Sequence, residues 1–265
     1  MALNHTHQAY PNYVLEKEIE DQYNSHLDLM RFCTVDNSLV GVAGDTKKIR
    51  VYSATNATEK LAMGEGNTKN IEVRYAEKEY TILMAQNRFP YYDEEQMRDP
   101  LVVDTGVRHM TTDMFNTTQG DIFTEFNKAT QIVNTAAFDF GAFVDAVAKL
   151  PGEDQEEREV FAFIHPNDKA AIRKALKDDL KYVESYVRSG YIGTVAGVNL
   201  YVKQDAVEGT ICGGTKKAVT YFNKRGVEVE QERDANVRLN EIYSRKYYLV
   251  ALTDETECFK IVKGA

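Results

Sequence analysis

Between residues 48 and 84 the sequence runs KIRVYSATNATEKLAMGEGNTKNIEVRYAEKEYTILM. Apolar side chains alternate with mostly charged ones over residues 48–52 and again over residues 71–76, and this period of two predicts two strands. Residues 54–70 separate the strands, whereas about two to five residues normally close a hairpin. The sequence therefore predicts a hairpin that is stretched far beyond the usual length.

A stretched hairpin has too little core to be stable by itself in water. Its tip is either disordered or held by a surface outside its own domain, and a neighbouring subunit is the simplest source of that surface. We therefore predict that the tip makes contacts between subunits. The predicted contact residues are Asn56, Glu59, Lys60, Leu61, Met63 and Lys69.

An amphipathic helix is predicted before the hairpin, over residues 12–30. Ile19, Tyr23, Leu27 and Met30 recur there at helical spacing, and charged residues occupy the other faces. The polar and small residues that precede this helix cannot form a core by themselves. We expect them to form an arm that becomes ordered on a partner.

A long helix is predicted to begin near residue 100. Asp99 has the character of an N-cap, Pro100 suits the first helical position, and an apolar stripe continues to Met114. Gly120 offers a stop, so a separate short helix is predicted around Phe126.

The second half of the chain combines helices with many strands. Asp139 is predicted to cap a helix, residues 160–164 have the continuity of a buried strand, and His165 begins a turn into another helix. Further strands are predicted over residues 198–202, 218–222, 227–232, 243–252 and 258–262, with turns at Gly197, Gly213-Gly214 and Gly226. The predicted fold class is α+β.

Charge and cysteine usage limit the function classes. The chain has 41 acidic and 32 basic residues and a net charge of −9, which argues against a surface that neutralises phosphates. Cys33, Cys212 and Cys258 are odd in number and far apart, as expected in a reducing compartment. The sequence has no apolar run of membrane-spanning length, and its first residues lack the regions of a signal peptide, so we expect neither secretion nor membrane insertion.

Signals for catalysis, metals or cofactors are weak, and we predict no catalytic, cofactor-binding or metal-ligating residues. The five histidines form no i, i+4 pair. The segment 209–216 approaches a phosphate loop, but Lys216 falls one place late, and a turn between strands is favoured. His165 and Asp168 could form a general base, although a turn in which Asp168 or Asn167 caps a helix is the more common role of such a segment.

Four segments resemble the major capsid proteins of tailed bacteriophages. They are VFAFIHP at 160–166, GYIGTVAGVNLYVK at 190–203, KRGVEVE at 224–230 and YYLVAL at 247–252. The resemblance implies a Hong Kong 97-like (Johnson) capsid fold with an N-terminal arm, an extended loop, a peripheral domain with a long spine helix, and an axial domain. The implied ranges are 1–47 for the arm and its helix, 48–90 for the extended loop, 91–136 with 231–265 for the peripheral domain, and 137–230 for the axial domain.

The same resemblance implies a shell subunit that self-assembles into the icosahedral head around double-stranded DNA. The expected partners are other copies in hexamers and pentamers, a portal protein, and DNA that is enclosed rather than specifically bound. A separate scaffolding protein is expected because the chain reaches its first amphipathic helix early. The expected location is the virion, after assembly in the bacterial cytoplasm. Two alternatives are an encapsulin-like compartment around a cargo enzyme and a hydrolase that uses His165 and Asp168.

Overall fold

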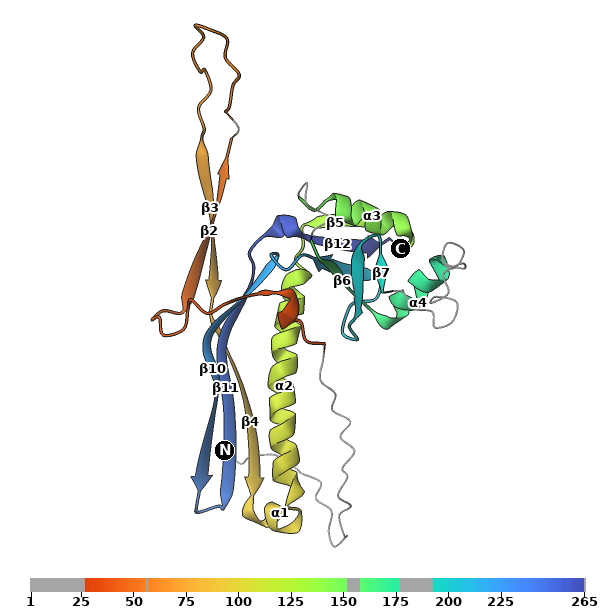
Figure 1. Cartoon of the computed structure of the whole chain (residues 1–265). Helices are drawn as coiled ribbons and strands as arrows, with labels where there is room; N and C mark the ends of the chain where they lie inside the picture. Colours follow the sequence, from red (N-terminus) through yellow and green to blue (C-terminus); the bar gives the residue numbers. More distant parts are fainter. Residues whose placement is uncertain (1–26, 56, 152–157, 177–192, 265) are drawn as a thin grey trace.

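The computed structural model describes residues 27–55, 57–151, 158–176 and 193–264. A four-stranded sheet and a six-stranded sheet form the body, and a two-stranded ribbon projects from it (Figure 1). In chain order the described elements are η1 (Met30–Phe32), β1 (Thr34–Asp36), β2 (Thr46–Ala54), β3 (Val73–Thr81), β4 (Leu83–Tyr92), α1 (Asp93–Arg98), α2 (Leu101–Phe126), β5 (Gln131–Thr135), α3 (Phe140–Ala148), β6 (Val160–Ile164), α4 (Pro166–Ala175), β7 (Thr194–Val195), β8 (Val198–Val202), β9 (Thr210–Gly214), β10 (Val219–Asp234), β11 (Leu239–Leu252), η3 (Glu255–Glu257) and β12 (Cys258–Lys263).

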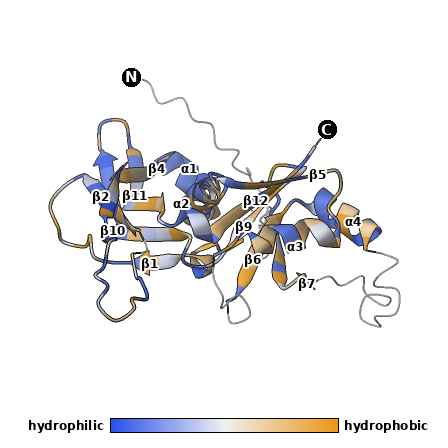
Figure 2. Cartoon of the chain, turned by 90° about the horizontal axis from the view of Figure 1, so that it is seen from above, coloured by the Kyte–Doolittle hydropathy of each residue, from blue (hydrophilic) through white to orange (hydrophobic). Residues whose placement is uncertain are grey.

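The four-stranded sheet carries the long helix on one face. Its order is β1-β10-β11-β4, and β10 and β11 pair antiparallel from Val219 opposite Leu252 to Asp234 opposite Leu239. Helix α2 runs along this sheet and contacts β4 and β11 more than it contacts β10 (Figures 1 and 2). The helix and the sheet thus form one elongated unit.

Helix α2 continues through Gly120, so our prediction of a stop there and of a separate helix around Phe126 was wrong. Glycine in a helix interior costs about 1 kcal/mol relative to alanine. Ile122 and Phe126, which follow it, are fully buried, and burial of two such side chains outweighs that cost. Near the other end, the side chain of Asp99 accepts a hydrogen bond from the Leu101 amide at 3.0 Å, although Pro100 holds the N-cap position.

The six-stranded sheet has the order β5-β12-β9-β6-β8-β7 and carries α3 and α4. Every residue of β6 is buried, as predicted for this strand. Asp139 caps α3 as predicted, because its carboxylate accepts from the Ala142 amide at 2.9 Å. Gly213 and Gly214 lie in β9, not in the turn that we predicted. A Cβ at Gly213 would lie 2.2 Å from the Phe161 carbonyl oxygen, so glycine is required there for close strand packing.

Two strands do not follow the division into peripheral and axial ranges that the sequence predicted. β12 falls within 231–265, yet it pairs with β5 and β9 in the six-stranded sheet. Most of β10, residues 219–230, falls within 137–230, yet it pairs with β11 in the four-stranded sheet. Gly226 lies inside β10, where the register shifts between Arg225 and Glu228, instead of forming the predicted turn. The division into domains itself stays a prediction.

An aromatic cluster joins the six-stranded sheet to α2 and η1. Phe161 and Phe163 of β6 meet Phe126 at the end of α2 with ring centroids 5.6 and 5.5 Å apart, and Phe32 of η1 lies 4.7 Å from Phe161. Most of the helix predicted over residues 12–30 lies outside the described residues. Its last described part is not α-helical, because residues 27–29 have no regular structure and Met30 opens the 3-10 turn η1.

Candidate assembly surfaces

Among the described residues, the ribbon of β2 and β3 contacts the body near its base. The two strands pair antiparallel from Thr46 opposite Thr81 to Ala54 opposite Val73, and the ribbon continues past them (Figure 1). Thr55 and Glu72 extend the pairing, since the Thr55 amide donates to the Glu72 carbonyl at 3.1 Å. The stretched hairpin that the sequence predicted is therefore present, although β3 begins at Val73.

At the base, apolar side chains of the ribbon pack on the four-stranded sheet. Ile49, Tyr80 and Ile82 contact a small cluster built around Phe222 and Leu249. The Tyr80 hydroxyl also donates to the Leu252 carbonyl at 3.1 Å, and Lys78 forms an ion pair with Glu255. These contacts set the direction of the ribbon.

Further out, one face of the ribbon carries a charge ladder that ends in a tyrosine pair. Glu77 lies 3.0 Å from both Lys48 and Arg50, and these hydrogen bonds hold the pKa of its carboxyl below the usual value. Next along the same face, the Tyr52 and Tyr75 rings lie 6.1 Å apart, and both side chains are about two-thirds exposed. Exposed aromatic rings on a projecting ribbon are typical of a surface that another protein covers.

The tip is ordered by contacts within itself. The Glu59 carboxylate accepts from the Thr68 amide at 2.8 Å and lies 3.6 Å from Lys69 Nζ. The Thr68 hydrogen bond is the main reason why the pKa of Glu59 lies below its usual value. The Glu65 amide closes a turn on the Ala62 carbonyl, and this turn contains Gly64 at a φ of +91°.

Five of the six predicted contact residues of the tip are described, and they fall into two groups. Glu59 and Lys69 face each other, whereas Lys60, Leu61 and Met63 are exposed, Met63 fully so. Asn56 lies outside the described residues. The exposed apolar side chains at the tip are available to another chain, and their contact with a neighbouring subunit stays a prediction.

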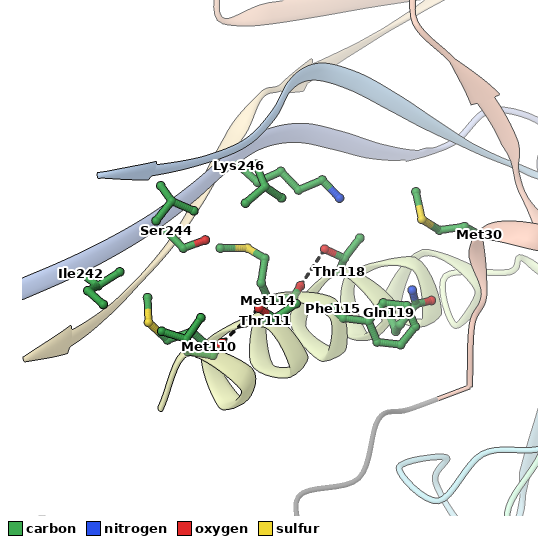
Figure 3. A pocket seen from close by; sticks show the side chains of 13 residues that line it. Met30, Met110, Thr111, Met114, Phe115, Thr118, Gln119, Ile242, Ser244 and Lys246 are labelled. Carbon is green, nitrogen blue, oxygen red and sulfur yellow. Dashed lines mark hydrogen bonds between the residues drawn. The ribbon is translucent and has the colours of Figure 1, made fainter. Parts of the chain in front are cut away.

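A second candidate surface, which the sequence did not reveal, is an apolar groove between α2 and the β10–β11 hairpin (Figure 3). Its volume is about 230 Å³, and apolar side chains form most of its wall: three methionines, three valines, Phe115 and Ile242. The alternation of Val227 and Val229 indicated a strand. It could not indicate that α2 leaves the side chains of these two valines uncovered. Lys246 lines the same groove.

His165 and Asp168 have structural partners. His165 is the N-cap of α4, where its Nδ1 accepts from the Asn167 amide at 3.2 Å, so our prediction that Asn167 or Asp168 caps this helix was wrong. Both Asp168 oxygens accept from the Gly209 amide, at 3.0 and 3.2 Å, and burial raises the pKa of this carboxyl. These contacts fix α4 to the start of β9.

The other residues considered for chemistry also lie in structural settings. Cys33, Cys212 and Cys258 are free and buried, and burial raises the pKa of the Cys33 and Cys258 thiols to about 12. Within the described ranges, no group of three or more histidine, cysteine or acidic side chains is placed to hold a metal ion. No helix of the described part is long and apolar enough to span a membrane.

The chain is similar to phage capsid proteins in both sequence and structure. It is 25% identical over 262 residues to the major capsid protein of Staphylococcus phage phiMR11, covering 95% of this chain and 93% of that protein. The capsid structure of cyanophage P-SCSP1u matches with a TM-score of 0.74 at 12% identity, covering 95% of this chain and 92% of that one. The mature capsid of bacteriophage PhiM1 matches with a TM-score of 0.73 at 11% identity, covering 95% and 91%. No family model matches the chain.

Proposed function

We propose that this chain, which has the Hong Kong 97-like fold of the tailed-phage capsid proteins, is a major capsid protein whose copies form the shell of a phage head. The observation that carries the proposal is the projecting ribbon, which is anchored at its base and exposes Tyr52, Tyr75, Leu61 and Met63. Similarity to a phage major capsid protein over nearly the whole chain supports the same assignment.

The ribbon supplies the geometry that a closed shell needs. A strand rises about 3.3 Å per residue, so the segment from Thr46 to Met63 reaches on the order of 50 Å. A projection of that reach lies across an adjacent copy, while a different surface of the same chain receives the ribbon of a third copy. Such heterologous contacts repeat around a symmetry axis until the ring closes. Each contact is modest, and their number makes the assembled shell durable.

The role of a shell subunit also implies which molecules the chain assembles with. Copies assemble as hexamers and pentamers around a portal protein, and a separate scaffolding protein guides them in the bacterial cytoplasm before the particle becomes a virion. The enclosed double-stranded DNA is held without specific contacts. The net charge of −9 supports this, because a strongly basic lining would bind phosphates tightly and oppose packing and release. The phage capsid relatives do not favour the encapsulin-like alternative.

Electron microscopy of particles tests the proposal. The full-length chain, with its scaffold if one is required, should form hollow particles of uniform size. A variant that lacks residues 56–68 should fold, because Thr55 can still pair with Glu72 across a short loop, but it should form few or no closed particles. Circular dichroism and the urea midpoint verify folding. Compact single chains from the full-length protein under assembly conditions would contradict the shell role, and normal particles from the deletion would contradict the role of the ribbon.

A further inference from the structure

The groove between α2 and the β10–β11 hairpin is open on the side of β10. α2 covers β4 and β11, so Val227 and Val229 of β10 are 57% and 66% exposed although they belong to the groove wall. β1 pairs with β10 only over residues 220–222. Beyond that point, among the described residues, no strand pairs with the outer edge of β10. This apolar surface thus lacks a cover from the body of the subunit.

The groove also contains a charged group. Lys246 extends into it from β11, above the side chains of Met114 and Thr118 (Figure 3). Its Nζ lies 5.1 Å from the centre of the Tyr221 ring and 5.4 Å from that of Tyr248. Within the described part of the chain, Lys246 has no carboxylate in ion-pair contact, and burial lowers the pKa of its ammonium. A suitable occupant therefore combines apolar side chains with a carboxylate.

The chain itself enters the described part at the end of this groove. The Leu29 amide donates to Oε1 of the buried Gln119 of α2 at 2.6 Å, and this bond fixes the chain against the helix. The next residue, Met30, is part of the groove wall. The described part of the chain thus begins at one end of the groove.

The preceding sequence has the required chemistry. Residues 14–21 read VLEKEIED, which places Val14, Leu15 and Ile19 among four acidic residues and one lysine. The eight residue steps from Ile19 to Leu27 reach up to about 28 Å when extended. The groove follows α2 from Val107 to Gln119, which is about 18 Å at 1.5 Å per residue. As part of the helix predicted over residues 12–30, the same eight steps reach about 12 Å. The segment can therefore enter the groove of its own subunit as a helix and span all of it when extended.

We propose that residues 14–21 occupy the groove of the same chain, with their apolar side chains against the methionines of α2 and Val229, and an acidic side chain on Lys246. The segment closes the apolar surface that α2 leaves uncovered and neutralises its ammonium group. This occupation concerns the single subunit and does not depend on whether shells form.

Crosslinking within the full-length chain tests the placement. Ile19→Cys is combined with Val229→Cys in the groove or, as the matched control, with the exposed Val144→Cys of α3, and each dilute protein is treated with a short bismaleimide. We expect a crosslink within one chain for the Val229 pair, formed at least about five-fold faster than for the Val144 pair. Equal rates would overturn the proposal. Crosslinks that form only between chains, in a mixture of the two single variants, would also overturn it, because the occupant would then be a second copy.

The charge contact has its own test. Lys246→Met keeps the length and apolar character of the side chain but removes the ammonium. A lost charge contact at a half-buried site should slow crosslinking of the Val229 pair by about five-fold. An unchanged rate would show that no acidic side chain binds Lys246. Hydrogen exchange in the unmodified chain needs no variant: amides of residues 14–21 should exchange more slowly than in a peptide of the same sequence, and equal exchange would overturn the docking.

Discussion

The ring of Phe89 on β4 fills the space that a side chain at Gly106 of α2 would need. A Cβ at Gly106 would lie only 2.3 Å from Cζ of that ring. The helix and the sheet therefore approach each other as closely as glycine allows, and Phe89 is held further by stacking on Tyr91 at 5.8 Å. This contact sets the spacing between α2 and β4 in the elongated unit, from which the ribbon projects.

Gly106→Ala should destabilise the subunit, and Gly120→Ala in the same helix is the matched control. A methyl group at Gly106 forces the Phe89 ring away, and such overpacking costs about 1–3 kcal/mol. Nothing lies within 4 Å of a Cβ at Gly120, so alanine there should stabilise the helix by up to about 1 kcal/mol. Urea unfolding midpoints measure the stability change of each variant. Equal shifts for the two variants would contradict the close contact.

Leu61→Ser combined with Met63→Ser should reduce particle formation several-fold without moving the unfolding midpoint. Both side chains are exposed at the tip, so the folded subunit loses almost no buried apolar area. Met97→Ser is the control, since Met97 is an exposed methionine on α1, at the other end of the molecule (Figure 1). Light scattering during assembly measures the rate of particle formation. A similar loss in the control would mean that the tip has no special role.

The order of the ribbon tip should depend on pH through Glu59. The pKa of this carboxyl is lower in the folded tip than in the unfolded chain, because the carboxylate accepts a hydrogen bond from the Thr68 amide. The stabilisation of the tip by Glu59 is therefore complete above the unfolded pKa and is lost as pH falls through the folded pKa. NMR titration should show this lowered pKa, and the Thr68 amide should exchange faster, relative to its intrinsic rate, as Glu59 becomes protonated. In Glu59→Gln, the relative rate should show no such step.

Asp168→Ala should destabilise the subunit by about 1–3 kcal/mol, because it removes the acceptor of the Gly209 amide. Asp168→Asn keeps an oxygen at that position and should retain most of the stability. Thermal unfolding of the two variants compares them directly. If Asp168→Asn lost more stability than Asp168→Ala, the fold would require the charge of Asp168 and not its hydrogen bond.

Several elements followed from the sequence because their signals are local. The alternation around residues 49 and 73, the cap at Asp139 and the unbroken apolar run of β6 each depend on neighbouring residues alone, and the structure confirms all three. The resemblance to phage capsid proteins rested on such segments, and the fold bears it out.

Features that depend on distant residues were missed. Gly120 reads as a stop, yet the core around Phe126 extends the helix through it. Gly213 reads as a turn residue, yet the reason for glycine is the Phe161 carbonyl, which lies far away in the sequence. His165 caps its helix in place of the acidic or amide side chain that capping preferences favour.

The sequence by itself determined that this protein carries a hairpin too long to be stable alone, because alternation and loop length are properties of consecutive residues. Only the tertiary structure decided which side chains of that hairpin face outward, that β12 joins the six-stranded sheet, and that Lys246 lies in an open apolar groove. Burial and pairing depend on which surfaces meet in space, and those surfaces come from segments far apart along the chain.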